Sequence, residues 1–198
     1  MASRKIRELY DLVEGIETAM FTTRRRDGHL VSRPMATQKR SPGADFWFVT
    51  YRGAEKLDEI AHDPHVNLSY YRDRTREWIS VSGIAETSEN RRKIRELYEP
   101  DWRAWFGDEG GKKDGGPDDP RMILIKVKAR EATFLDIKKP QPVVLFEVLK
   151  GMVTGKKPNL GRTRHAKSSD FPGAGRRPRS KRSKGTSAGV SRRRRARG

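Results

Sequence analysis

The sequence predicts a mainly β domain, a small six-stranded antiparallel β-barrel that is closed or partly open and has flanking helices. Six segments show the alternation, or the aromatic and β-branched composition, that is typical of strands. The first two are joined by RDGH (26–29), in which Asp27 followed by Gly28 is a strong hairpin signal. Strands and helices do not alternate along the chain, which argues against a parallel α/β sheet.

The elements follow in order from periodicity and turn residues. The chain opens with an amphipathic helix that Ser3 can cap, because apolar residues recur at helical spacing at Ile6, Leu9, Tyr10, Val13 and Ile16. Strands are expected at 18–25, 30–38, 46–51, 65–73, 77–88 and 121–137. Further helices are expected at 52–64, at 89–106 with an interruption at Pro100, and at 142–153. Gly83 indicates a bulge or bend in the fifth strand.

Charge is distributed very unevenly along the 198 residues, whose net charge is +18. Residues 150–198 hold 17 Lys and Arg and one acidic residue, Asp170, which leaves only +2 for the rest of the chain. We therefore expect a folded domain at 1–155 and a disordered, strongly basic tail at 156–198. The stretch 176–198 either contacts nucleic acid without reading its sequence or has no specific partner.

Several classes of protein are excluded or not supported. No run of 18 apolar residues is present, so no membrane span is expected. The chain contains no cysteine, which excludes disulfides and thiol catalysis and fits a cytoplasmic protein. No metal site is expected, because Pro64 separates His62 from His65 and no third ligand follows. No residue stands out as catalytic.

Arg33 and Lys56 are the two cations that suggest an anion site. Arg33 precedes Pro34 in LVSRPMATQ (30–38), and we expect the proline, which has no N–H, to open the sheet ladder there. Arg33 is then either a surface arginine or an anion ligand. Lys56 lies in the first turn of the helix expected at 52–64, where the free N–H groups and the dipole favour phosphate. It is either a solvated lysine or the partner of a phosphate.

A short aromatic segment, PDWRAWFG (100–107), follows the second amphipathic helix. Its two tryptophans and one phenylalanine are either an anchor in the core or in a dimer interface, or an aromatic wall for a planar ligand. The residues alone do not decide between these two roles.

The chain resembles the general stress protein branch of the pyridoxamine 5′-phosphate oxidase-like flavin-binding proteins. The resemblance covers roughly residues 5–137, more loosely to about 162, and is carried by TAMFTT, GHLVSRPMA, FWFVTY, EKLDEIAHDPHVNLSYY, WISVSGIAE and LYEPDWRAWF. It implies a split β-barrel that forms a homodimer, with FMN bound in a cleft at the dimer interface.

The resemblance also implies a phosphate site. Arg33 and Lys56 occupy the positions whose side chains hold the FMN phosphate in such proteins. One arginine and one lysine can neutralise a phosphate that is close to dianionic.

The rest of the implied site contacts the ring and the ribityl chain. The backbone of Pro34 and Met35 would run along the isoalloxazine ring. Thr50 and Tyr51, which end the third strand, would contact the ring or the ribityl chain, and Trp102 would close the site from the partner subunit.

The function implied is that of an FMN-binding general stress protein, a flavin-dependent oxidoreductase or a flavin carrier. True pyridoxamine 5′-phosphate oxidases end in a strand with an arginine–histidine pair, whereas RTRHAK (162–167) falls in the expected disordered tail, so that activity is not expected. The alternatives are a split barrel that binds F420 or haem, and a nucleic-acid-binding module that acts through the tail.

Overall fold

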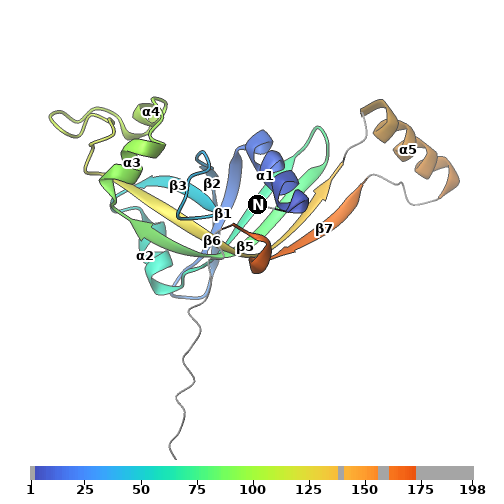
Figure 1. Cartoon of the computed structure of the whole chain (residues 1–198), viewed down its shortest axis with the longest axis horizontal. Helices are drawn as coiled ribbons and strands as arrows, with labels where there is room; N and C mark the ends of the chain where they lie inside the picture. The colour runs from blue at the N-terminus through green and yellow to red at the C-terminus, as the bar shows by residue number, and fades with distance from the viewer. Residues whose placement is uncertain (1–2, 138–140, 156–160, 173–198) are drawn as a thin grey trace, which may run out of the picture.

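The computed structural model of the chain describes residues 3–137, 141–155 and 161–172. The strands are β1 (Thr18–Arg24), β2 (Leu30–Ala36), β3 (Phe46–Tyr51), β4 (His65–Arg72), β5 (Glu77–Ser88), β6 (Met122–Asp136) and β7 (Arg162–Lys167). The helices are α1 (Arg4–Ile16), α2 (Glu55–His62), α3 (Arg91–Leu97), α4 (Trp102–Phe106), α5 (Gln141–Thr154) and the short 3₁₀ turn η1 (Ser168–Asp170). The strands form one antiparallel sheet that curls into a half-barrel with flanking helices, which confirms the predicted fold class (Figure 1).

The strand order is β2-β1-β4-β5-β6-β3, and β7 pairs with β6 outside this path. Strands β2 and β3 are therefore the two ends of the sheet, and the barrel is split between them. Just beyond β2 the Gln38 N–H donates to the Trp47 carbonyl at 2.8 Å, so the two edges approach each other there. Edge strands present backbone donors and acceptors that no neighbouring strand uses.

Helix α1 covers the inner face of the sheet. It begins after Ser3, whose Oγ accepts a hydrogen bond from the Ile6 N–H at 3.4 Å, as predicted. Its apolar stripe is buried against β4, β5, β6 and β7. The helix ends at Ile16, and the N–H of the next residue, Glu17, donates to the Val13 carbonyl at 2.7 Å before the chain enters β1.

Two apolar clusters form the core. The larger lies between α1 and the inner face of the sheet and includes Phe21, Phe48 and Phe134. Helix α2 contacts β1 and β5 and contributes Ile60 to this cluster. The smaller cluster lies beneath α3 and α4 and consists of Trp47, Ile94, Leu97, Trp102, Met122 and Leu124.

Pro34 does not open the ladder, so that expectation is wrong. The pairing of β1 with β2 runs from Thr18↔Ala36 to Arg24↔Leu30 without a register shift, and Pro34 lies opposite Met20. The physical reason is the position of β2 at the edge of the sheet. A proline is tolerated in an edge strand because the N–H that it lacks would not have been needed by a second neighbour.

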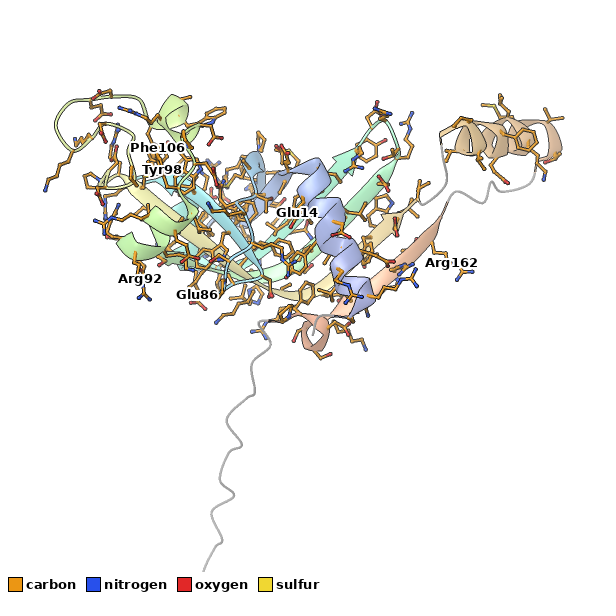
Figure 2. The ribbon with its side chains drawn as sticks, turned by 45° about the horizontal axis from the view of Figure 1, so that its top comes forward. Glu14, Glu86, Arg92, Tyr98, Phe106 and Arg162 are labelled. Atoms are coloured by element: carbon orange, nitrogen blue, oxygen red, sulfur yellow. The ribbon has the colours of Figure 1, made fainter. Side chains whose placement is uncertain are left out.

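The expectation of disorder from residue 156 is wrong for 162–172. Strand β7 pairs with the second half of β6 from Asp136↔Arg162 to Glu131↔Lys167, and Arg162 projects outward from it (Figure 2). Apolar contacts hold this segment against the domain: Ala166 is fully buried, and the Phe171 ring packs edge-on against Tyr10 at a centroid distance of 6.5 Å. Residues 156–160 and 173–198 lie outside the described residues, so the prediction for the 176–198 tail stands untested.

The remaining elements lie close to their predicted places. Strand β5 shifts register between Ser82 and Gly83, and a Cβ at Gly83 would lie 2.8 Å from the Lys128 carbonyl oxygen, which explains the glycine. Helix α5 lies beyond the ends of β6 and β7, away from the curled sheet (Figure 1). No helix in the described part of the chain is long and apolar enough to cross a membrane.

Candidate functional site

The two cations singled out in the sequence meet at one end of the split, close to α2. Arg33 lies opposite Phe21 in the β1–β2 ladder, so its side chain is on the inner face of the sheet, and that side chain is 20% exposed. Lys56 comes from the first turn of α2. Arg33 Nη2 donates to Glu59, which lies one turn after Lys56 on α2, so the two cations flank the same turn of that helix.

A buried hydrogen-bond network holds Arg33. Its Nη1 donates to Thr23 Oγ1 at 2.7 Å and its Nη2 donates to Glu59 Oε2 at 2.9 Å. The Thr23 hydroxyl in turn donates to the same Glu59 oxygen at 2.5 Å. Burial alone would raise the pKa of Glu59, but the hydrogen bonds from Thr23 and Arg33 and the charges of Arg33 and Arg25 outweigh it and lower that pKa. Glu59 is therefore an ionised, buried carboxylate at neutral pH.

Lys56 has a different set of partners. Its Nζ donates to Thr50 Oγ1 at 3.0 Å and lies 5.7 Å from the centre of the Tyr51 ring. Burial, and then the positive charge of Arg33, lower the pKa of Lys56. The half-buried ammonium is thus held in a place where its charge is penalised, and a bound anion would remove that penalty.

The low pKa of Lys56 predicts a stability effect with a defined sign. Its folded-state pKa lies below the ordinary value of 10.5, so folding disfavours the charged form and Lys56 reduces stability at neutral pH. We expect Lys56→Met to raise the free energy of unfolding at pH 7 by up to about 1 kcal/mol. The gain should shrink as the pH approaches 10.5, where the unfolded chain also loses the proton.

Urea denaturation of the protein without ligand at both pH values measures this effect. Lys112→Met, at an exposed loop position, is the matched control and should change stability little. A Lys56→Met protein that is less stable than the parent at pH 7 would contradict the prediction.

The other predicted site residues divide into two groups. Pro34 is exposed on the outer face of β2, and Met35 is buried on the inner face, so their shared backbone runs along the split edge. Thr50 is buried beside Lys56, whereas Tyr51 is 56% exposed. The structure thus gathers Arg33, Thr50, Tyr51 and Lys56 around one end of the split.

Trp102 does not join this group. It is 2% exposed in the smaller core cluster, and its Nε1 donates to Gln38 Oε1 at 3.0 Å. Tyr98 packs edge-on against it at 5.6 Å, and Tyr98 and Phe106 lie together where α3 meets α4 (Figure 2). The exposed aromatic residue of this segment is Trp105, at 86%.

Glu59 and Thr23 are the parts of the site that the sequence did not reveal. Glu59 follows Lys56 by three residues in one helix, so helical spacing could have placed both on the same side of α2. No local signal marks Thr23, whose partners come from β2 and α2.

The segment RTRHAK (162–167) forms a strand but not a joint phosphate site. Arg164 lies opposite Phe134 on the inner face and bonds to Glu8. His165 lies opposite Thr133 on the outer face, and its Nδ1 is 3.0 Å from Thr133 Oγ1. Because neighbouring residues of a strand point to opposite faces, Arg164 and His165 of one chain cannot converge on one group.

The chemistry of the gathered residues fits a phosphate monoester. Two cations and one carboxylate leave one net positive charge, and the Thr50 hydroxyl adds a polar contact. No group of side chains suited to hold a metal ion is present among the described residues.

Comparisons with known proteins identify the family of this chain. Residues 4–159 match the family described as pyridoxamine 5′-phosphate oxidase like. Protein bli-3 of Neurospora crassa is 37% identical over 164 residues, which cover 81% of this chain and 78% of that protein. A crystal structure described as general stress protein 26 from Jannaschia sp. CCS1 superposes with a TM-score of 0.64 at 25% identity, over 81% of this chain and 96% of that chain.

A second solved structure supports the fold alone. It is described as a general stress FMN/FAD binding protein from Xanthomonas citri and superposes with a TM-score of 0.54 at 21% identity, over 67% of this chain and 89% of that chain. The shared architecture is the split barrel.

Proposed function

Because this chain belongs to the pyridoxamine 5′-phosphate oxidase-like family, we propose that it binds FMN and that Arg33 and Lys56 hold the FMN phosphate. The observation that carries the proposal is the pair of neighbouring cations on β2 and α2 at one end of the split. A phosphate placed between them would pair with both and would offset the burial of Lys56.

The rest of the flavin would follow the split edge. The backbone of Pro34 and Met35 supplies donors and acceptors to the ring, and Thr50 and Tyr51 lie beside Lys56 for the ribityl chain or the ring. FMN when bound supplies electron-transfer chemistry, and the protein binds and orients it. We place the protein among general stress proteins that act as flavin oxidoreductases or flavin carriers.

FMN is favoured over the other cofactors considered for this fold. All four histidines are exposed, which is unsuited to an axial haem ligand in a pocket. F420 shares the phosphate chemistry, so competition between FMN, F420 and haem distinguishes them.

The full-length protein should show flavin absorbance and quenched flavin fluorescence after FMN is added and unbound FMN removed. A folded protein that retains no FMN would overturn the proposal.

The proposal includes a homodimer, and the outer face of the sheet supports it. This face is uncharged over two cross-strand rows, although 35% of the chain is charged, and such charge depletion is typical of the centre of an interface. The rows are Tyr71, Trp78 and Leu135, and Met20, Ser69, Ser80 and Thr133. Light scattering should give twice the chain mass of 22.7 kDa, and a monomer would reject this part.

A second activity is proposed for the basic tail, because residues 176–198 carry 11 basic residues and no acidic residue. Its contact with nucleic acid would be salt-sensitive and blind to sequence. A chain truncated after Pro172 keeps β7 and η1, so it should retain FMN binding and lose salt-dependent RNA binding. RNA binding that survives the truncation would reject the assignment to the tail.

The proposal also includes a cytoplasmic location.

A further inference from the structure

Glu59 is out of place in an anion site. Its side chain is 7% exposed, and its negative charge lies within hydrogen-bond distance of the arginine proposed to meet a phosphate. Burying a carboxylate is costly, and placing it near a second anion adds repulsion. A residue with these two disadvantages needs a compensating role.

The contacts of Glu59 indicate what that role is. One oxygen, Oε2, accepts from both Thr23 Oγ1 at 2.5 Å and Arg33 Nη2 at 2.9 Å. Thr23 also accepts from Arg33 Nη1 at 2.7 Å, so Thr23 and Glu59 hold the two terminal nitrogens of the guanidinium from one side. A guanidinium is planar and carries five N–H donors. These two bonds fix its plane and leave donors for an anion.

The surroundings of Glu59 keep this arrangement in place. Thr23 is 1% exposed, and Glu59 follows Lys56 by one turn of α2. The second oxygen of Glu59, Oε1, lies 3.6 Å from Arg25 Nε, which adds an ion pair from the β1–β2 turn. The carboxylate therefore ties β1, β2 and α2 together beneath the two cations, and its charge counteracts the effect of Arg33 on Lys56.

We propose that Glu59, with Thr23, is a positioning residue that orients the Arg33 guanidinium toward the flavin phosphate and so gives the protein its preference for FMN over riboflavin. This inference rests on the proposed function, since it assigns the phosphate to Arg33. Glu59 acts through Arg33 and does not touch the flavin itself. Its removal should therefore weaken binding of the phosphorylated flavin and leave riboflavin binding unchanged.

The test measures the affinities of the full-length protein for FMN and for riboflavin by fluorescence quenching. Glu59→Ala should weaken FMN binding by about 10-fold or more, the size of a lost charge-assisted contact, and change riboflavin binding by less than about twofold. Glu59→Gln should restore most of the FMN affinity, because its amide oxygen still accepts from Arg33. Asp58→Ala, at an exposed position next to it on α2, is the matched control and should leave both affinities unchanged.

Thr23→Val keeps the shape of the side chain and removes only the hydroxyl, so it tests the network even if Glu59→Ala does not fold. Thr23→Val should lower the ratio of FMN affinity to riboflavin affinity, as Glu59→Ala does, but by a smaller factor. If Thr23→Val and Glu59→Ala leave the ratio of FMN affinity to riboflavin affinity unchanged, the positioning role is overturned. The proposal that the protein binds FMN would still stand. Failure of the unaltered protein to bind FMN would instead overturn the proposed function together with this inference.

Discussion

Replacing Arg33 with alanine is expected to weaken FMN binding by about 10- to 100-fold, the range of a charge-assisted contact to a phosphate. The loss should lie toward the upper end, because the substitution leaves Glu59 ionised beside the phosphate without its partner on β2. Lys56→Ala should cost less, because Lys56 Nζ donates to the neutral Thr50 hydroxyl, so its loss does not deprive Glu59 of a hydrogen-bond donor. Riboflavin, which lacks the phosphate, should bind both variants as it binds the parent.

The same substitution should also destabilise the protein, because it removes one partner of a buried pair. The double variant Arg33→Ala/Glu59→Ala should recover part of that stability, but of the FMN affinity only the share that is lost to repulsion from Glu59. Arg26→Ala is the matched control, since Arg26 lies in the hairpin turn and lines the same surface hollow as Glu59. If Arg26→Ala weakens FMN binding as much as Arg33→Ala does, the effect is general electrostatics and the phosphate site is not where we place it.

Local signals were sufficient for most of the fold. Asp27 and Gly28 produce the β1–β2 hairpin, Ser3 caps α1, and Gly83 lies at the bulge where a side chain would meet Lys128. Each of these features is decided by residues close to one another in the chain or by the steric demand of a single position. Together, these local features were enough to predict the antiparallel fold class.

Strand β7 could not be predicted in the same way. Its sequence, RTRHAK, has one buried residue, Ala166, and a composition that resembles the basic tail. It becomes a strand because β6 is long enough to offer a second half to pair with, some 30 residues earlier in the chain. Strand propensity is dominated by such non-local pairing. The expectation that Pro34 opens the β1–β2 ladder was wrong for the same reason. The pairing of distant strands makes β2 an edge strand, and no local signal in the sequence indicates this.

The candidate site was predictable only for residues with a chemical signature. Arg33 and Lys56 stand out as cations at an unusual strand and at a helix start. Glu59 and Thr23 need the fold, because three elements have to meet before their hydrogen bonds exist. The sequence also could not tell that Trp102 would be buried and Trp105 exposed, because the contact with Gln38 that fixes Trp102 comes from beyond β2.

Asp119→Ala should produce the largest loss of stability, about 3–5 kcal/mol, the cost of removing one partner of a buried ion pair. Asp119 is fully buried and accepts from the backbone N–H groups of Gly115 at 2.9 Å and Arg121 at 2.8 Å. The Arg121 guanidinium donates to it at 2.6 Å and also to the Phe106 carbonyl at 2.9 Å. The pair therefore ties the end of α4 to the start of β6.

The pH dependence of stability provides an independent measure of the same pair. Burial alone would raise the pKa of Asp119, but the hydrogen bonds from Arg121 and from the backbone outweigh it and lower the pKa from 3.8 to about 2. Because the folded-state pKa lies below the unfolded value, the carboxylate stabilises the fold above about pH 4 and loses that effect as the pH falls toward 2. The difference corresponds to about 2 kcal/mol.

Urea denaturation between pH 7 and pH 2 should therefore show a loss of stability in the parent that is smaller in Asp119→Asn, which has no proton to gain. Asp118→Ala is the matched control, because Asp118 is 62% exposed and its ion pair with Arg95 lies on the surface, where such pairs contribute little. If Asp118→Ala and Asp119→Ala destabilise the protein equally, the buried pair does not anchor the segment between α4 and β6. An unchanged pH profile in Asp119→Asn would show that other carboxylates account for the acid sensitivity.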